Sequence, residues 1–148
     1  MLFKGSSVAL VTPMQKDGSI DYDALSGLVA WHMDAGTESL VVLGTTGESS
    51  SLTFTERESV IGAVVSQVSG CIPVIVATGS TSTAATLEYT QQAESLGASG
   101  ALLVTPYYVK PTQQGLFEHF SFIAQQCSIP QILYNVPSRS GCDLQPET

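Results

Sequence analysis

The sequence predicts an α/β fold with a parallel sheet, because short apolar runs alternate with amphipathic segments along the chain. The apolar runs begin about 30 residues apart, which is the span of a strand–helix–strand unit. They are Val8–Val11, Leu40–Leu43, Pro73–Ala77, Ala101–Val104 and Gln131–Tyr134. Apolar and polar residues alternate little within each run, which is typical of strands covered on both faces. One domain is expected over residues 1–148.

The first two intervals between these runs each carry a helical pattern. In the first, Asp21 precedes the helix and Gly36 stands where a C-terminal cap is expected. The shared face of this helix comprises Leu25, Leu28, Val29 and His32. In the second, Thr55 and Glu58 match a capping box. The apolar stripe behind that box comprises Val60, Ile61, Val64, Val65 and Val68.

The next two intervals also predict helices. The third helix is closed by Gly97, and its face comprises Ala85, Tyr89, Ala93 and Leu96. Thr112 is a suitable N-cap for the fourth helix. The residues that share a face of the fourth helix are Leu116, Phe120, Ile123 and Ala124. Together with the apolar runs, these patterns predict about five strands and four helices in strict alternation.

Two folds are compatible with such a sheet, a flat doubly wound sheet and a (β/α)8 barrel. Polar or turn residues follow every strand, notably GTTGE at 44–48, TPYY at 105–108 and YNVPSR at 134–139. A site built from many successive strand ends is typical of the barrel, whereas a flat sheet binds ligands at one switch point. The sequence therefore favours the first part of a (β/α)8 TIM barrel, since a whole barrel needs about 250 residues.

Composition argues against several classes of partner. The chain has 5 Lys and Arg against 13 Asp and Glu, a net charge of −8, so nucleic acid is not an expected partner. No apolar run approaches the roughly 20 residues of a membrane span, which favours a cytoplasmic protein. Cys71, Cys127 and Cys142 are widely spaced, so neither a metal site nor a disulfide is predicted.

The segment after the second strand is the first candidate binding element. Gly44 and Gly47 permit unusual backbone angles, and Thr45 and Thr46 present hydroxyls and backbone N–H groups between them. Such a turn can bind a carboxylate. An ordinary strand-to-helix turn remains the alternative, because Gly and Thr are common in turns.

Tyrosines and one arginine follow the fourth and fifth strands. Tyr107 and Tyr108 are adjacent, so they cannot both point inward, and packing is an alternative role for each. Tyr134 ends a strand, and as a general acid or base it would need partners that polarise its phenol. Arg139 lies in a Pro-Ser-Arg-Ser-Gly loop just beyond and is a candidate carboxylate clamp, with a solvated charge as the alternative.

The remaining basic residues are not expected to take part in catalysis. His32 and His119 lie within helical patterns, away from the strand ends. Lys4, Lys16 and Lys110 lie outside the predicted strands. Burial within a strand could lower the pKa of a lysine and so favour imine formation, and none of the three has that position.

With these segments placed, the chain resembles the dihydrodipicolinate synthase family of class I pyruvate-dependent aldolases. The motifs that carry the resemblance are GTTGE, VTPYYVKPTQQGLFEHF and PQILYNVPSRSGCDLQPET. The resemblance implies a TIM barrel, usually a homotetramer, that joins pyruvate to L-aspartate semialdehyde through a lysine Schiff base in lysine (diaminopimelate) biosynthesis. No cofactor or metal is implied.

The resemblance also implies roles for individual residues. Thr45, Tyr134 and Tyr108 match the family's proton relay, with Tyr108 reaching into a neighbouring subunit's site. Thr46 resembles the residue whose backbone holds the pyruvate carboxylate, and Arg139 resembles the arginine that receives the semialdehyde carboxylate. The family's imine lysine lies beyond Thr148, so this chain by itself is expected to be inactive.

The resemblance extends to a regulatory site found in members inhibited by lysine. Ser49, Ser50 and Tyr107 would fit that effector site. Three positions depart from it, because Phe54, Thr81 and Ala85 stand where those members place a histidine, an asparagine and an acidic residue.

Two other functions remain as alternatives. One is a related pyruvate aldolase such as N-acetylneuraminate lyase, which Arg139 disfavours. The other is a non-catalytic half-barrel that associates with itself, because about five strands leave open sheet edges and a bare inner face.

Overall fold

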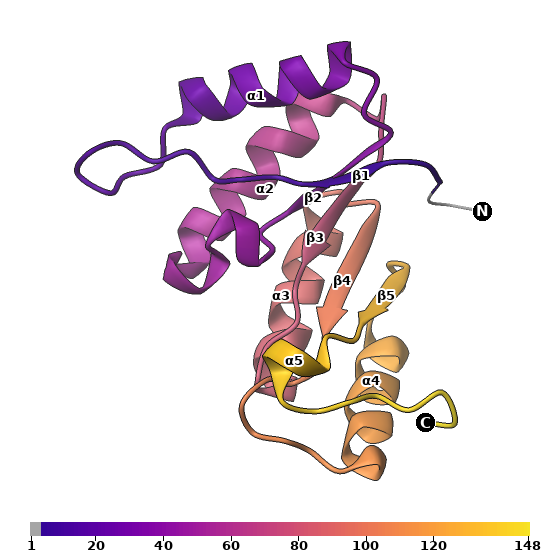
Figure 1. Ribbon diagram of the computed structural model, residues 1–148. Helices are drawn as coiled ribbons and strands as arrows, with labels where there is room; N and C mark the ends of the chain where they lie inside the picture. Colours follow the sequence, from indigo (N-terminus) through magenta and orange to yellow (C-terminus); the bar gives the residue numbers. More distant parts are fainter. Residues whose placement is uncertain (1–3) are drawn as a thin grey trace.

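Five parallel strands form one sheet in the order in which they occur along the chain (Figure 1). The computed structural model describes residues 4–148, so the first three residues of the predicted 1–148 domain lie outside the described residues. The strands are β1 (Ser7–Ala9), β2 (Ser39–Val42), β3 (Val74–Ala77), β4 (Gly100–Val104) and β5 (Gln131–Tyr134). Each crossover therefore advances by one strand in the same direction. A doubly wound sheet would reverse that order, so the topology is that of an opening barrel.

Four long helices connect the strands, and each lies in an interval where the sequence predicts one. They are α1 (Tyr22–Asp34), α2 (Phe54–Val68), α3 (Thr83–Ser95) and α4 (Gln113–Gln126). The predicted alternation of strands and helices is confirmed. None of the helices in residues 4–148 combines the length and the apolar character that a membrane span requires.

Side-chain hydrogen bonds determine where the helices begin. Asp21, Ser82 and Thr112 each accept a hydrogen bond from a backbone N–H in the first turn of the helix that follows. The capping box of α2 is formed by Thr53 and Glu56, so its prediction at Thr55 and Glu58 is wrong. Both pairs satisfy the same spacing pattern, and the chain leaves its extended conformation at the earlier pair.

The structure has a fifth, short helix within the segment for which the sequence predicts a loop. It is α5 (Pro137–Ser140), which begins with Pro137 and is capped at its C-terminus by Gly141, whose φ is 74°. The Ser140 hydroxyl donates to the carbonyls of Val136 and Cys142, at 3.1 and 2.9 Å, and so closes the turn. The predicted bounds of the first strand are also too late, because β1 ends at Ala9 and only the Leu10 N–H continues the pairing, to Val41.

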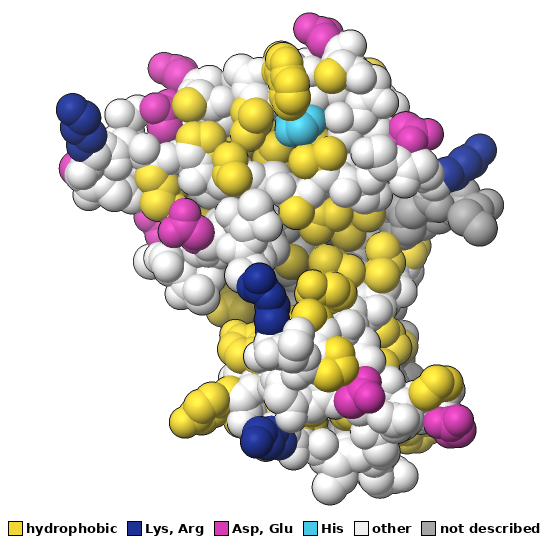
Figure 2. Space-filling model, in the orientation of Figure 1, with side chains coloured by type: hydrophobic (Ala, Val, Ile, Leu, Met, Phe, Trp, Pro, Cys, Tyr) yellow, Lys and Arg dark blue, Asp and Glu magenta, His cyan; other side chains and the backbone are white. Residues whose placement is uncertain are grey.

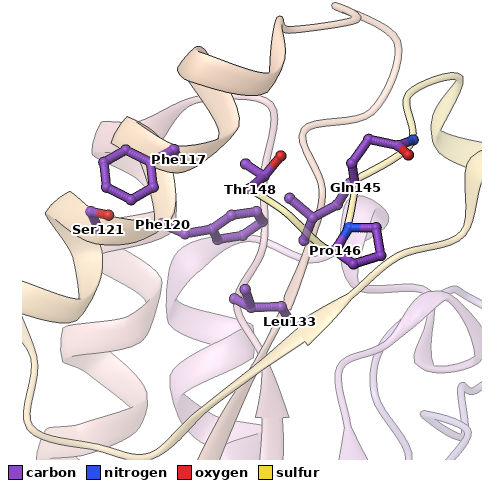
Figure 3. A pocket seen from close by; sticks show the side chains of 8 residues that line it. Phe117, Phe120, Ser121, Leu133, Gln145, Pro146 and Thr148 are labelled. Carbon is purple, nitrogen blue, oxygen red and sulfur yellow. The ribbon is translucent and has the colours of Figure 1, made fainter.

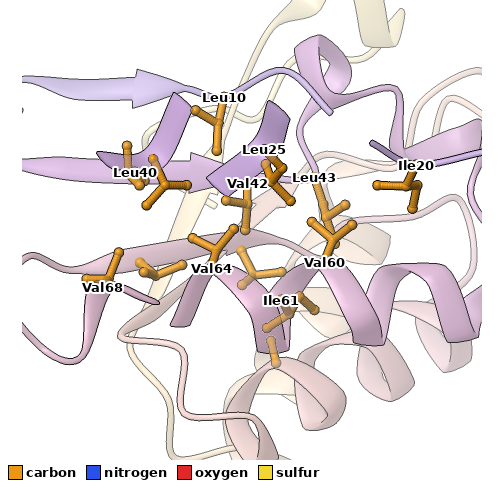
Figure 4. Packing of buried hydrophobic residues seen from close by; sticks show 14 residues of the cluster. Leu10, Ile20, Leu25, Leu40, Val42, Leu43, Val60, Ile61, Val64 and Val68 are labelled. Carbon is orange, nitrogen blue, oxygen red and sulfur yellow. The ribbon is translucent and has the colours of Figure 1, made fainter. Parts of the chain in front are cut away.

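Apolar side chains pack in two clusters on the helical side of the sheet. The larger lies between β2, β3, α1 and α2 and includes Leu40, Val42 and Val64 (Figure 4). The smaller lies between β4 and α4 and includes Leu103, Leu116 and Ile123. Alternate residues of the same strands, such as Val41 and Leu102, face the opposite side and line an open groove.

That opposite face is only partly covered. Tyr134, which lines the groove on this face, is 42% exposed. Figure 2 shows hydrophobic side chains across the narrow middle of the molecule, between two broader ends. In a closed barrel this face would be interior, so its exposure follows from the incomplete ring of strands.

Candidate active site

The open groove brings most of the predicted site residues together. It has a volume of about 970 Å³ and lies along the inner face and the carboxyl ends of the strands. Its lining includes every predicted site residue except Tyr108, namely Thr45, Thr46, Ser49, Ser50, Tyr107, Tyr134 and Arg139. Residues far apart in sequence meet there because parallel strands end at one edge of the sheet.

The turn that carries Thr45 and Thr46 is held in an unusual conformation. Leu43 has a φ of 59°, so the chain turns away from the sheet directly after β2. A 3-10 turn (Thr45–Gly47) follows, and Glu48, with a φ of 53°, closes it by donating its N–H to the Thr45 carbonyl. Both threonines are exposed to the groove.

Thr12 anchors this turn, a role that the sequence pattern does not predict. Its hydroxyl is buried and donates to the Gly47 carbonyl at 2.8 Å. A methyl group at Gly47 would lie 3.1 Å from the Leu10 carbonyl oxygen and 3.3 Å from the Thr12 hydroxyl. The turn therefore packs tightly against the segment after β1, and a side chain at Gly47 would require these neighbours to move by a few tenths of an ångström.

The predicted relay residues do not form a continuous chain of hydrogen bonds. Thr45 and Tyr134 line the same groove, but no hydrogen bond joins their hydroxyls in the described part of the chain. Tyr134 is 42% exposed. The Tyr134 carbonyl accepts a hydrogen bond from the Thr105 N–H at 3.0 Å, which attaches the end of β5 to β4.

The two adjacent tyrosines point in different directions. Tyr107 is 41% exposed and lines the groove, whereas Tyr108 is 88% exposed and lies outside it. Tyr108 has a φ of 71°, and its N–H donates to the Ser140 carbonyl at 2.9 Å. The Tyr108 phenol is thus presented to the outside of this chain by a backbone conformation that L-residues seldom adopt.

Arg139 lies on α5 at the wall of the groove and is exposed. The Arg139 N–H donates to the Val136 carbonyl at 2.9 Å, so its backbone position is set by the short helix. Because the Tyr108 N–H also bonds to α5, at Ser140, the loop after β4 and the loop after β5 support each other.

Arg57 is a second residue beside the groove that is not among the predicted site residues. It is only 4% exposed, and its Nη2 donates to the Ala77 carbonyl at 2.9 Å. Its guanidinium lies 4.2 Å from the centre of the Tyr89 ring. Burial lowers the pKa of Arg57, while the nearby phenols of Tyr89 and Tyr107 act in the opposite direction.

A signal for Arg57 was present in the sequence. It lies three, four and seven residues before Val60, Ile61 and Val64, so it falls on the apolar face of α2. A charged residue on a buried face requires a partner, and here the partners are a carbonyl and an aromatic ring.

The remaining basic and metal-binding residue types contribute nothing to the groove. Lys4, Lys16 and Lys110 are exposed and do not line it. His119 is buried between α3 and α4, where its Nδ1 makes a 2.8 Å hydrogen bond with the Thr83 hydroxyl. In the described residues no group of His, Cys, Asp and Glu side chains is arranged to hold a metal ion.

A second, smaller pocket of about 390 Å³ lies between α4, β5 and the segment near Thr148 (Figure 3). Phe117, Phe120, Leu133 and Pro146 supply most of its walls. No titratable side chain lines this pocket, so the larger groove is the candidate active site.

Comparison with known proteins shows strong similarity along the whole chain. The model of the dihydrodipicolinate synthetase family matches residues 2–148. A 4-hydroxy-tetrahydrodipicolinate synthase from Coxiella burnetii (strain Dugway 5J108-111) is 60% identical over 147 residues, which are 99% of this chain and 51% of that protein. The corresponding enzyme from Teredinibacter turnerae is 52% identical, with 50% of its length covered. The chain thus spans about half the length of the curated relatives that it matches.

Solved structures agree with this similarity. The chain is similar to dihydrodipicolinate synthase from Aquifex aeolicus, with 49% identity, a TM-score of 0.94, and 97% of this chain and 48% of that chain covered. It is also similar to the chloride-inhibited enzyme from Acinetobacter baumannii, solved with pyruvate, at 50% identity and a TM-score of 0.95 over 97% of this chain and 49% of that one. The expected fold, the first part of a TIM barrel, is confirmed by these neighbours.

Proposed function

Because the chain belongs to the dihydrodipicolinate synthetase family, we propose that the complete protein containing it is a 4-hydroxy-tetrahydrodipicolinate synthase. This lyase would condense pyruvate with L-aspartate semialdehyde in lysine biosynthesis. One relative that carries this name is 60% identical to the chain over about half of its own length. The resemblance stated from the motifs alone is confirmed at the level of the family.

One structural observation carries the proposal. The lining of the groove includes two separate groups suited to carboxylates, the turn of Thr45 and Thr46 after β2 and Arg139 on α5. Each proposed substrate has one carboxylate, so a condensation that joins them needs two such groups on opposite sides of the reacting carbons. The backbone of Thr46 would hold the carboxylate of pyruvate, and Arg139 that of the semialdehyde.

Proton transfer is assigned to hydroxyls in the same region. Thr45 and Tyr134 line the groove and would move protons between the two substrates. Tyr108 is directed away from the groove of its own chain, and it would complete the relay in a neighbouring subunit. This assignment requires a homo-oligomer, with the tetramer usual in the family as the expected form, and we propose the cytoplasm as its location.

The Schiff base needs a lysine that lines the groove. Lys4, Lys16 and Lys110 are exposed and lie outside the strands, so none is suited to the role. We assign the nucleophile to the family's imine lysine, which the resemblance places beyond Thr148.

The test is an assay of the complete protein with pyruvate and L-aspartate semialdehyde, together with borohydride reduction in pyruvate alone. We expect consumption of both substrates and one trapped pyruvate per chain on a lysine other than Lys4, Lys16 and Lys110. Peptide mass mapping identifies the modified residue. Cleavage of N-acetylneuraminate in place of the condensation would favour the related aldolase, and the absence of any adduct would favour a non-catalytic half-barrel.

A further inference from the structure

The ladder of backbone hydrogen bonds between β2 and β3 stops one hydrogen bond (one rung) early, at the turn that carries Thr45. Leu40 pairs with Val74 and Val42 with Val76, and the Leu40 N–H donates to the Pro73 carbonyl. In a parallel ladder the donors on one strand recur every second residue. The next rung after Val42 would therefore join the Gly44 N–H to the Ala77 carbonyl.

That rung is absent because Leu43 turns the chain away. Leu43 has a φ of 59°, and the Gly44 carbonyl is already engaged in the turn, where it accepts from the Gly47 N–H at 3.0 Å. The Ala77 carbonyl, left without its strand partner, accepts instead from Arg57 Nη2 at 2.9 Å. A side chain from α2 thus replaces the missing backbone donor.

Arg57 is well fixed for this purpose. Its guanidinium lies over the Tyr89 ring of α3, and the Tyr89 ring in turn stacks on Phe54 of α2, with centroids 6.1 Å apart. A charged donor makes a stronger bond to a carbonyl than a neutral amide does. Burial of a guanidinium without a carboxylate partner is unfavourable, so its presence at this rung calls for a specific role.

We infer that Arg57 is a positioning residue for the turn of Thr45 and Thr46. By satisfying the Ala77 carbonyl, it allows Gly44 to leave the sheet and the turn to face the groove. Without Arg57, the Ala77 carbonyl would lack a donor, and pairing it with the Gly44 N–H, its partner by the strand register, would draw the turn back into the sheet. Thr12 holds the other end of the same turn through Gly47.

The consequence for substrates rests on the proposed function. Thr46 lies in the turn that would hold pyruvate, whereas Arg139 lies on a separate element, α5, whose backbone is held by Val136 and not by the strands β2 and β3. Loss of the Arg57 donor should therefore impair the use of pyruvate and leave the KM for the semialdehyde nearly unchanged. A general loss of folded protein would instead lower kcat and leave both KM values as they are.

The experiment compares three variants of the complete protein. Arg57→Met removes all donors at similar length, Arg57→Lys retains one charged donor, and Tyr89→Leu removes the stacked ring but leaves the bond to Ala77 in place. We expect Arg57→Met to raise the KM for pyruvate about tenfold or more, since a charged hydrogen bond is lost. Arg57→Lys should recover most of this loss, and Tyr89→Leu should lower the Tm with little effect on the KM for pyruvate.

A second measurement does not depend on activity. Hydrogen exchange of the Gly44, Thr45 and Thr46 amides should change in Arg57→Met and should stay close to the wild type in Arg57→Lys and Tyr89→Leu. If Arg57→Met yields no folded protein, Arg57→Gln, which is too short to reach Ala77, takes its place.

Two results would overturn the inference. One is an unchanged KM for pyruvate together with unchanged exchange in the variant without the donor. The other is an equal rise of that KM in Tyr89→Leu. A wild-type protein that fails to use pyruvate would refute the proposed function, while the exchange data would still decide the role of Arg57.

Discussion

The hydroxyl of Thr12 donates a buried 2.8 Å hydrogen bond to the carbonyl of Gly47, across 35 residues of sequence. This contact joins the segment after β1 to the turn of Thr45 and Thr46. The first prediction is that Thr12→Val lowers the free energy of unfolding by about 1–3 kcal/mol, because valine keeps the shape and leaves the Gly47 carbonyl unsatisfied. Urea unfolding measures the change. Thr12→Ser, which keeps the donor, is the control, and equal stability of the Val and Ser variants would contradict the prediction.

The second prediction concerns the close approach of Gly79 to β4. A methyl group at Gly79 would overlap the backbone nitrogen of Val104 and lie 2.9 Å from its carbonyl oxygen. Gly79→Ala should therefore cost about 1–3 kcal/mol of stability through overpacking. Gly62→Ala is the matched control, since nothing lies within 4 Å of a methyl group there and alanine favours the helix. Equal changes in Tm for the two variants would contradict the prediction, because they would show that the backbone at Val104 can move to accommodate the methyl group without strain.

The third prediction is a loss of stability in mildly acidic solution that depends on His119. Burial lowers the pKa of His119 below its ordinary value of 6.5. The folded state therefore binds fewer protons than the unfolded state below pH 6.5, and stability falls as the pH drops from there towards the lowered pKa.

Unfolding free energies measured between pH 5 and 8 test this prediction. The variant His119→Asn can still bond to the Thr83 hydroxyl and does not titrate, so its stability should depend less on pH in this range. The same pH dependence in the variant and in the wild type would assign the effect to other groups.

The fourth prediction concerns Arg139 in the complete enzyme. Arg139→Ala should raise the KM for L-aspartate semialdehyde about tenfold or more, because a charge-assisted, two-pronged contact is lost, and should change the KM for pyruvate little. Steady-state kinetics with each substrate varied in turn provide the measurement. Arg139→Lys, which retains the charge alone, should give an intermediate value. Equal damage to both KM values would refute the assigned role.

The fifth prediction is that lysine inhibits the complete enzyme only weakly. Phe54 is stacked on Tyr89, and Ala85 offers no carboxylate to an ammonium group. The buried charge beside Tyr107 is the Arg57 cation, which disfavours a second positive charge. Inhibition curves with L-lysine should show half-inhibition at millimolar or higher concentration. Sub-millimolar inhibition would contradict this, and its loss in Glu88→Ala would identify the missing acidic partner.

Local chemistry made most elements predictable from the sequence. The fifth strand has the predicted bounds, and Thr112 caps α4 as expected, because strand runs and N-caps depend on residues close together in the chain. Where two local signals competed, or where the segment was very short, the sequence did not show where the helix begins. Thr53 and Thr55 both match a capping box, and Pro137 begins a helix in a segment too short for periodicity to detect.

The residues that hold the groove together depended on the tertiary structure. Arg57 reaches Ala77 across 20 residues only because β2 ends at Val42 and leaves one rung of the ladder open. Thr12 reaches Gly47 because β1 and the turn end at the same edge of the sheet. The sequence by itself determined the order of the elements and the residue types at the strand ends. Strand register and the point at which each strand leaves the sheet decided which of those residues meet, because hydrogen bonds between distant segments form only once the register has placed the donor and the acceptor together.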